Sequence, residues 1–252
     1  MRYISFASGS SGNCALISEG GTHILLDAGI SARRIKEALS RFGLRPEDVS
    51  AVAVTHEHSD HIGGLKVFLK ACAAEVYTSR GTAGALISSG MDPRRIHTME
   101  AGETSTLGRL TLTPFATPHD AAESFGYILR GAGEKLAVVT DLGCVTPEVE
   151  RAAEGCAAAV LEANHDVEML RSGPYPYPLK ARILGSRGHL SNESCAAFAE
   201  FLAERGMKRL LLAHLSAENN TPELALRAVG ERLGNFPAET APRAAFSRVI
   251  EV

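Results

Sequence analysis

The sequence lacks the apolar segments that take a chain to or across a membrane. No apolar run approaches the roughly 20 residues that a helix needs to cross a bilayer. The first residues, MRYISFASGSSGN, contain no apolar core of a secretory signal. We therefore expect a soluble, cytoplasmic protein with no membrane partner.

Cysteine is scarce, and its spacing does not suggest a disulfide framework. The cysteines are an odd number, include no CxxC pair and mostly stand among Ala, Val or Leu. This pattern favours reduced, partly buried thiols. The five residues are Cys14, Cys72, Cys144, Cys156 and Cys195.

A surplus of basic residues is also missing. The chain has 26 Lys and Arg against 29 Asp and Glu, which gives a net charge of −3. Proteins that bind a polyanion normally carry a basic surplus, so the overall charge weighs modestly against nucleic acid. A local basic patch or bound cations would override this.

The 252 residues are 45% hydrophobic, which is enough for a substantial core. Short β-type runs alternate with helical patterns, and no repeat or linker interrupts them. We predict one α/β domain over residues 1–252, with helices at 31–42, 61–72, 80–89, 191–205 and 221–233. The predicted strands are CALIS, THILLD, AVAVT, RLTLTPFA, GYILR, LAVVT, AAAVLEA, RLLLAHL and AFSRVIEV.

Residues 55–61 read THEHSDH, so three histidines and two acids follow the apolar run AVAV. If the turn is extended, the side chains at 56, 58 and 60 point roughly the same way, and His61 begins the next helix with Ser59 as a cap. Imidazoles and carboxylates are good ligands for Zn²⁺ or Mn²⁺, and a cation offsets the cost of crowding them at a partly buried site. Gly63 and Gly64 would let this segment pack closely against other backbone. The spacing predicts a metal centre rather than a solvated polar turn.

This HxHxDH spacing resembles that of the metallo-β-lactamase superfamily. The resemblance implies an αββα four-layer sandwich of two mixed β-sheets flanked by helices. It implies two divalent metal ions at the sheet edges, Zn²⁺ or Mn²⁺ with Fe²⁺ as a further candidate. His56 and His58 would ligate the first ion, and Asp60 and His61 would serve the second.

The same resemblance implies single ligands further along the chain, in a fixed order. His119 stands in ATPHDA, Asp141 in VVTDLG and His214 in LLLAHLS. Taken alone, these would be a surface histidine, a helix cap and a core imidazole. Their order behind HxHxDH makes them ligand candidates, with Asp141 as the bridge between the ions.

The second half of the chain narrows the resemblance. The stretches LEANHD, GHLSNESCAA and LAHLSAENN, with SFASGSSGN near the start, resemble the small bacterial subgroup called YycJ, WalJ or VicX, over about residues 3 to 225. The second and third stretches also look like those of ribonuclease Z and phosphodiesterase relatives. In those relatives a histidine that opens the helix lies near the scissile phosphate, and His189 has that position. A helix-start histidine that contacts backbone is the alternative.

These groups suit hydrolysis. Two ions bridged by Asp141 and a water would lower the pKa of the water and make a metal-bridging hydroxide the nucleophile. Asp60 would orient this water, and His189 would stabilise the transition state or protonate the leaving alkoxide. His165 is a further catalytic candidate, with a structural loop residue as the alternative. Glu162 is a candidate for orienting ligand imidazoles.

Two segments are candidates for binding the substrate. The turn SGSSGN at 8–13 suits an anion, and the resemblance places it beside the metals, which makes Ser8 and Asn13 candidates. The segment YPYPLKARILGSR at 175–187 combines aromatic rings for stacking with cations for phosphates, including Lys180 and Arg187. A hairpin turn and a proline-rich surface loop are the alternatives.

Three functions remain open. The favoured hypothesis is a metal-dependent hydrolase of phosphodiester bonds, and by analogy with the subgroup a DNA nuclease that resembles a 5′-to-3′ exonuclease. A dinuclear-metal hydrolase of a small phosphodiester, lactone or thioester is the alternative, which the net negative charge favours. The third is a non-catalytic metal-binding regulator linked to two-component signalling. The sequence does not give the metal, the choice of DNA over RNA, or the oligomeric state.

Overall fold

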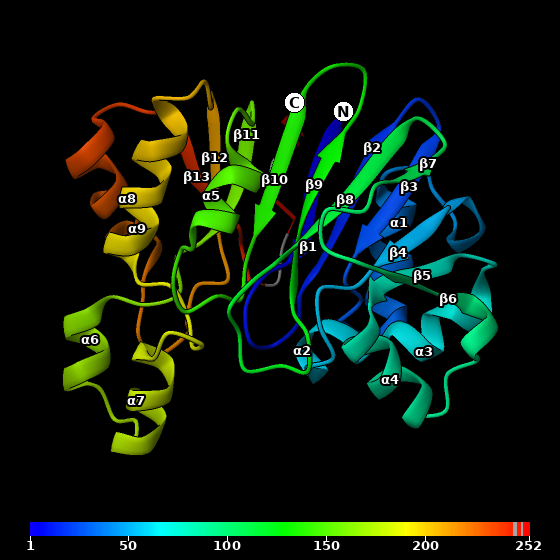
Figure 1. Ribbon diagram of the computed structural model, residues 1–252, viewed down its shortest axis with the longest axis horizontal. Coiled ribbons are helices and arrows are strands. Elements are labelled where there is room, and N and C mark those ends of the chain that lie inside the picture. Colours follow the sequence, from blue (N-terminus) through cyan, green and yellow to red (C-terminus); the bar gives the residue numbers. More distant parts are fainter. Residues whose placement is uncertain (244–245, 248) are drawn as a thin grey trace.

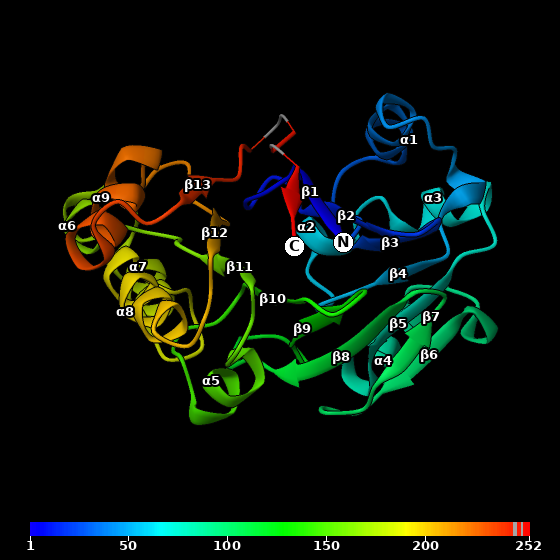
Figure 2. The ribbon, with the colours of Figure 1, turned by 90° about the horizontal axis from the view of Figure 1, so that it is seen from above.

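Two mixed β-sheets pack face to face, and helices cover both outer faces (Figures 1 and 2). The computed structural model describes residues 1–243, 246–247 and 249–252. Within these residues each sheet has seven strands. The architecture confirms the predicted αββα sandwich, whereas a single domain over 1–252 stays a prediction.

The first sheet contains strands from both ends of the chain. Strands β3 to β6 are parallel, and β14, β1, β2 and β3 pair antiparallel. In spatial order the strands are β14 (Ile250–Glu251), β1 (Arg2–Ala7), β2 (Cys14–Glu19), β3 (Thr22–Leu26), β4 (Ala51–Ala53), β5 (Glu75–Ser79) and β6 (Ile96–Met99).

The second sheet comes from the second half of the chain. Strands β10 to β13 are parallel, and β7 to β10 pair antiparallel. In spatial order the strands are β13 (Ala238–Thr240), β12 (Arg209–Ala213), β11 (Ala158–Glu162), β10 (Lys135–Val139), β9 (Phe125–Arg130), β8 (Leu110–Ala116) and β7 (Ser105–Leu107).

Three apolar layers hold the sandwich together. Side chains such as Ile17 and Val160 meet between the sheets. Ile35 belongs to the layer between the first sheet and its helices, and Phe198 to the layer between the second sheet and its helices. The helices are α1 (Ala32–Arg41), α2 (Ser59–Ile62), α3 (Leu65–Phe68), α4 (Arg80–Ser88), α5 (Pro147–Ala153), α6 (Val167–Ser172), α7 (Tyr177–Leu184), α8 (Asn192–Ala203) and α9 (Pro222–Leu233).

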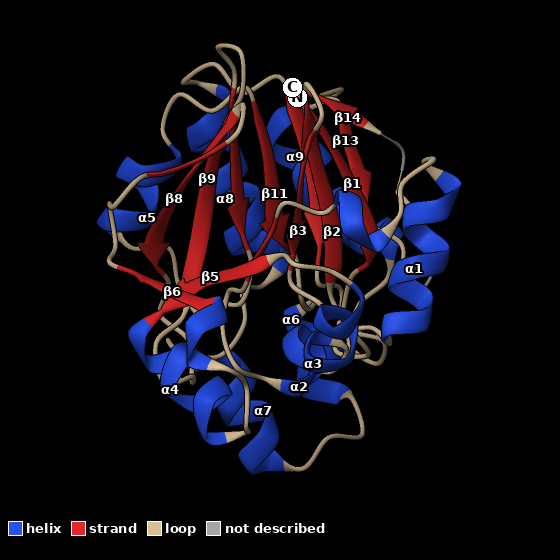
Figure 3. Cartoon of the chain, turned by 90° about the vertical axis from the view of Figure 1, so that its right-hand side faces the viewer, coloured by secondary structure: helices blue, strands red, loops and turns tan. Residues whose placement is uncertain are grey.

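The two ends of the sandwich differ. In Figure 3 the chain termini lie at the top, whereas α2, α4, α6 and α7 lie at the bottom. The parallel strands of both sheets point their carboxyl ends toward this lower edge (Figure 1). Polar residues that follow these strands therefore meet at one edge of the molecule.

The structure corrects the helix predicted at 61–72. The first helix begins at Ser59 rather than His61, and the residue in the N-cap position is His58, not Ser59. The chain is then interrupted at Gly64 and continues as α3 and a short 3₁₀ turn. A side chain at Gly64 would overlap the carbonyl of Ile30, which confirms the expected close packing.

Other local predictions have mixed outcomes. The strand predicted as AFSRVIEV is described only as β14, and residues 244, 245 and 248 lie outside the described residues. Helices α6 and α7 were not predicted. All five cysteines are free thiols, as expected, and three of them are buried. Within the described part of the chain, no helix has the length and apolar character needed to cross a membrane.

Candidate metal centre

Polar side chains that follow six strands meet at the lower edge of the sandwich. Most of these side chains are fully buried, although each is ionisable or a strong hydrogen-bonding group. Burying so many such groups is costly unless they are paired or bind a cation. They are Asp27 after β3, His56 and His61 after β4, His119 after β8, Asp141 after β10, Glu162 at the end of β11 and His214 after β12.

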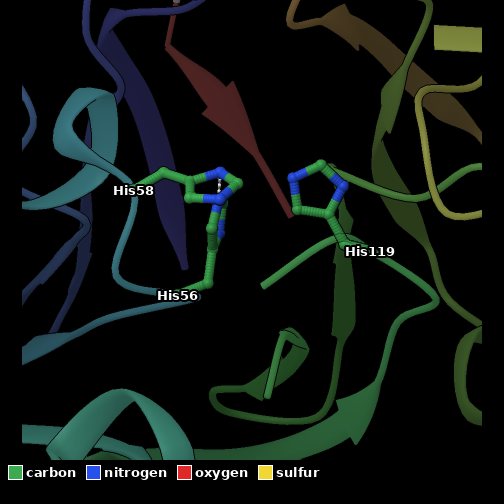
Figure 4. Close-up of side chains that lie close together, drawn as sticks. All are labelled: His56, His58 and His119. Carbon is green, nitrogen blue, oxygen red and sulfur yellow. Dashed lines mark hydrogen bonds between the residues drawn. The ribbon is translucent and has the colours of Figure 1, made fainter. Parts of the chain in front are cut away.

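His56 and His58, predicted to ligate the first ion, lie together with His119. His56, His58 and His119 form one group, in which each residue offers an atom within 4.8 Å of the others. Figure 4 shows the rings of His56 and His58 beside each other, with the ring of His119 facing them from the second sheet. The ring centroids of His119 lie 4.9 Å from His56 and 5.1 Å from His58.

Asp60 and His61, predicted to serve the second ion, form an adjacent group with His214. Oδ2 of Asp60 lies 3.4 Å from Nε2 of His61 and 3.7 Å from Nε2 of His214. Asp141 lies between the two groups. Its Oδ2 is 3.5 Å from Nε2 of His61, and its Oδ1 is 3.6 Å from Nε2 of His214 and 4.0 Å from Nε2 of His119. The structure thus brings together all seven residues predicted as ligands.

Four of the imidazoles are each held in place by a contact at Nδ1. Nδ1 of His61 donates to Asp27, Nδ1 of His119 donates to the carbonyl of Gly188, and Nδ1 of His214 donates to Glu162. Nδ1 of His56 lies 3.0 Å from the hydroxyl of Thr55. Each ring therefore keeps Nε2 for the centre, which is the usual arrangement of metal-binding histidines.

Two buried atoms at the centre have no hydrogen-bond partner among the described residues. They are Oδ2 of Asp141 and Nε2 of His214. Buried polar atoms are almost always paired, so each such exception needs a physical reason. A divalent cation supplies one, because carboxylate oxygen and neutral imidazole nitrogen are both good ligands. The residues present therefore fit a metal centre.

Asp27 and Thr55 support the centre and were missed by the sequence analysis. Oδ1 of Asp27 accepts hydrogen bonds from the N–H and the hydroxyl of Thr55, and Oδ2 accepts one from Nδ1 of His61 at 2.8 Å. Asp27 is 3% exposed. The sequence did contain a signal, because ILLDAG places an acid after an apolar strand, as VVTDLG does for Asp141.

The backbone is strained at the same places. Asp27, Asp141 and His214 have φ values of 57°, 58° and 56°. Within the described residues, these are the non-glycine residues with positive φ. The left-handed region costs free energy for a residue with a side chain, and such strain clusters at functional sites. All three residues follow a strand and turn a side chain into the centre.

Glu162 joins His189 to the metal-ligand candidates. Its Oε1 accepts hydrogen bonds from Nδ1 of His189 at 2.7 Å and from Nδ1 of His214 at 2.9 Å. Its Oε2 accepts hydrogen bonds from the N–H groups of Leu142 and Leu190. This buried carboxylate fixes both imidazoles, so the predicted role of Glu162 as an orienting residue agrees with its contacts.

Burial and neighbouring charges shift the pKa values of the groups at the site in different directions. Burial, with the nearby His61, lowers the pKa of His56 to about 2, so His56 is neutral. Burial opposes charge on His61 too, but Asp141 and Asp27 raise its pKa to about 10. Burial disfavours ionised Asp60, yet the imidazoles of His214 and His61, whose Nε2 atoms lie 3.7 and 3.4 Å from Oδ2, hold its pKa well below the usual range.

Ser8 and Asn13, predicted to bind substrate, contact the ligand candidates. Oγ of Ser8 accepts a hydrogen bond from the N–H of His214 at 2.7 Å. Nδ2 of Asn13 donates to Oδ2 of Asp60 at 3.2 Å and lies 3.0 Å from Nε2 of His61. Both side chains therefore hold the centre in place, and a contact with substrate stays a prediction.

Lys180 and Arg187 are tied to backbone carbonyls. Nζ of Lys180 donates to the carbonyls of Arg171 and Gly173, at 2.7 Å each. Nε and Nη2 of Arg187 donate to the carbonyl of His119 at 2.9 and 2.7 Å. Arg187 thus fastens the segment before His189 to the loop that carries His119. Contact with substrate phosphates stays a prediction for both cations.

His165 lies beneath the surface near the centre. Its side chain is 1% exposed, and neither ring nitrogen has a hydrogen-bond partner among the described residues. Burial lowers the pKa of this imidazole. The four donor groups that the described residues form do not include His165. Its predicted catalytic role therefore stays a prediction.

Sequence comparisons identify relatives over most of the chain. A family model described as the beta-lactamase superfamily domain matches residues 22–215. Exodeoxyribonuclease WalJ of Streptococcus pneumoniae is 38% identical over 229 residues, which are 89% of this chain and 85% of WalJ. Exodeoxyribonuclease YycJ of Bacillus anthracis is 38% identical over 230 residues, which are 90% of this chain and 87% of YycJ.

Solved structures with low identity share the fold. Zn²⁺-bound PqqB from Methylobacterium extorquens superimposes with a TM-score of 0.76 at 18% identity, over 100% of both chains. The short form of human tRNase Z superimposes with a TM-score of 0.69 at 17% identity, also over 100% of both chains. At these identities the likeness establishes the αββα architecture alone.

Proposed function

Because the chain belongs to the metallo-β-lactamase superfamily and is similar over most of its length to the exodeoxyribonucleases WalJ and YycJ, we propose that it is a metal-dependent nuclease that hydrolyses phosphodiester bonds of DNA. The observation that carries the chemistry is the pairing of His189 with Glu162 at 2.7 Å beside the seven predicted ligands. Such a pair adds a proton donor to a metal centre. The 5′-to-3′ direction is part of the proposal.

The residues that would hold two divalent ions divide into two groups. His56, His58 and His119 would bind one ion, and Asp60, His61 and His214 would bind the other. Asp141 would contact both, because its two oxygens face both groups. When bound, divalent ions lower the pKa of a coordinated water and withdraw charge from phosphoryl oxygens. Zn²⁺ and Mn²⁺ suit this donor set, and Fe²⁺ is a further candidate.

Asp60 would position the attacking water. Its carboxylate stays ionised because His214 and His61 hold its pKa low, so it accepts a hydrogen bond from a water proton. Its side chain is 22% exposed, more than those of His61 and His214 on either side of it. Asp60 can therefore reach both the centre and the solvent from which water enters.

His189 would protonate the leaving oxygen. Burial opposes its charge, but Glu162 raises its pKa above the ordinary value, which favours the protonated form. Its side chain is 24% exposed and Nδ1 lies 3.9 Å from Oδ1 of Asp141. A protonated imidazole there can donate to an oxygen bonded to phosphorus next to the centre. His165, which is buried, is proposed as a further catalytic residue on this side of the site.

DNA as the partner rests on the relatives and on a local excess of positive charge. Residues 167–188 contain four basic residues and one acidic residue, a net charge of +3 in a chain whose net charge is −3. Ser8, Asn13, Lys180 and Arg187 are proposed as the residues nearest the substrate. The overall negative charge favours the second candidate, hydrolysis of a small phosphodiester, lactone or thioester by the same centre.

A third candidate, a non-catalytic metal-binding regulator, is weaker. A regulator needs ligands but has no use for a proton donor beside them, and His189 lies in that position. Isolation in a tight complex with a signalling protein, without hydrolysis of any ester, would favour this candidate instead.

The proposal is tested with an end-labelled DNA duplex that carries a 5′-phosphate, incubated with Mn²⁺ and the native protein or Asp60→Ala. We expect stepwise shortening by the native protein alone, and the order of the products gives the direction. The metal content of both proteins is measured on the same samples. No cleavage by native protein with metal bound would overturn the nuclease proposal and leave a small ester as the substrate.

A further inference from the structure

Helix α7 extends from the edge that carries the metal centre. Figures 1 and 3 show it beyond the ends of the strands, on the side of the molecule away from the termini. Two arginines attach it to the loop that carries His119. Arg182 forms an ion pair with Asp120, and Arg187, just after the helix, donates to the carbonyl of His119. The carboxyl end of α7 is therefore next to the centre, and its amino end lies farther out.

One face of α7 is apolar and exposed. Tyr177 is 83% exposed and Leu184 is 42% exposed, whereas Ile183 is buried and anchors the helix. Tyr177, Ala181 and Leu184 follow the spacing i, i+4, i+7 and so share one side of the helix, and Ala181 is exposed as well. We refer to these three residues as the α7 face. Covering an aromatic ring that is exposed to this extent is favourable, because it removes apolar surface from water.

The segment that carries the α7 face has a net positive charge, but its cationic groups do not cover the three apolar side chains. Lys180 and Arg187 direct their cations to backbone carbonyls. The side chains of Arg171 and Arg182 remain 64% and 60% exposed although each contacts an acid. The segment thus presents an apolar strip inside a region of net positive charge. A nucleic-acid strand matches this pattern, because its bases are flat and apolar and its phosphates are anionic.

We propose that the α7 face binds the bases of the DNA strand whose phosphate lies at the metal centre, with one base stacked on Tyr177. This inference rests on the proposed nuclease function. Seven residues of helix separate Tyr177 from Leu184, a rise of about 10 Å. Stacked nucleotides are about 3.4 Å apart, so the strip spans about three of them. The α7 face therefore contacts only a short length of the strand end. It does not distinguish the bases, since every base has a flat aromatic surface.

The test compares native protein, Tyr177→Phe and Tyr177→Ala on single-stranded oligonucleotides of two to ten nucleotides and on bis-p-nitrophenyl phosphate. We expect kcat/KM of the native protein to rise with length over the first nucleotides and then level off. Tyr177→Ala should lose about tenfold on long oligonucleotides through KM, with kcat unchanged. It should hydrolyse the small diester at the native rate. Tyr177→Phe keeps the aromatic face and should behave as the native protein.

Three outcomes would overturn this inference. The first is the same length dependence for Tyr177→Ala and native protein, with native DNA degradation intact, which leaves the proposed function standing. The second is no degradation of DNA by native protein, which removes the function as well. The third is sedimentation of the native protein as a dimer and of Tyr177→Ala as a monomer, which would assign the α7 face to a second copy of the chain.

Discussion

The backbone N–H of Ala122 donates a 2.7 Å hydrogen bond to Oε1 of Glu57. Oε2 of the same carboxylate accepts a hydrogen bond from the hydroxyl of Thr82 at 3.1 Å. Glu57 lies between His56 and His58, whereas Ala122 belongs to the loop that carries His119. One side chain therefore joins the two parts of the chain that carry the ligand candidates His56, His58 and His119.

Glu57→Ala should weaken metal binding by releasing the His119 loop. Loss of a residue that holds a ligand typically lowers metal affinity about 10- to 100-fold. Glu57→Gln keeps an acceptor for the N–H of Ala122 and should fall between the alanine variant and native protein. Competition with a chelator measures the affinity. Equal affinities for Glu57→Ala and native protein would show that the loop does not need this carboxylate.

Metal binding should release protons from the metal-free protein. Burial disfavours charge on His61, but Asp141 and Asp27 raise its pKa to about 10, and the pKa of His214 is raised well above the ordinary value. His61 is therefore protonated at pH 7 when no metal is bound, and the neighbouring Asp141 favours the protonated form of His214 as well. A protonated imidazole must lose a proton to ligate. The charge on these imidazoles stabilises the metal-free fold below pH 6.5, and this contribution is lost as the pH rises toward the folded pKa.

Calorimetric titration of metal into metal-free protein, in two buffers that differ in ionisation enthalpy, counts these protons. We expect at least one proton released per protein at pH 7 and an affinity that increases about tenfold per pH unit for each proton released. Heats that do not depend on the buffer would show that the imidazoles are already neutral.

Asp27→Asn should lower both stability and metal affinity. The amide cannot accept all the hydrogen bonds from Thr55 and His61 that the carboxylate accepts, and the site is buried. An unsatisfied buried donor costs about 1–3 kcal/mol. Asn tolerates positive φ, so the backbone at this position is not an added cause.

Urea unfolding of metal-free Asp27→Asn measures the loss of stability, and chelator competition measures the affinity. Thr55→Ser is the matched control, because it keeps the hydroxyl that bonds Asp27. It should bind metal as native protein does. A native affinity for Asp27→Asn would mean that His61 does not depend on Asp27 for its orientation.

Asp27 also shows where the sequence analysis was limited. The HxHxDH cluster after an apolar strand pointed to a metal centre, and its resemblance to the metallo-β-lactamase superfamily implied the sandwich and the order of the later ligand candidates. Asp27 follows ILL in the same way, but no spacing to another ligand pointed to it. Asp27 has this role because His61 and Thr55 lie next to it. The pairing of β3 with β4 places them there.

Helix α7 was missed for a different reason. The segment GPYPYP is rich in proline and is typical of a loop. In the structure Pro176 takes the N-cap position of α7, and a proline also lies in its first turn, where a missing N–H costs nothing. The contact of Arg182 with Asp120 spans 62 residues, which no local pattern predicts.

His189→Ala should separate proton donation from metal binding. His189 lies in a donor group with Asp141, Glu162 and His214, so the geometry also permits it to be a ligand. If it is a proton donor, the alanine variant lowers kcat by about 10²- to 10⁴-fold and keeps its metal. Asp141→Ala should lose metal as well as activity, because Asp141 faces both ligand groups.

Elemental analysis after gel filtration gives the metal content of each variant, and Glu162→Gln provides a matched comparison. It should lower kcat as His189→Ala does, since a neutral amide no longer raises the pKa of His189 as the Glu162 carboxylate does. It should lose less metal than Asp141→Ala, because His214 loses an orienting contact but keeps Nε2. Loss of metal from His189→Ala would make His189 a ligand and leave the proton donor to be found elsewhere.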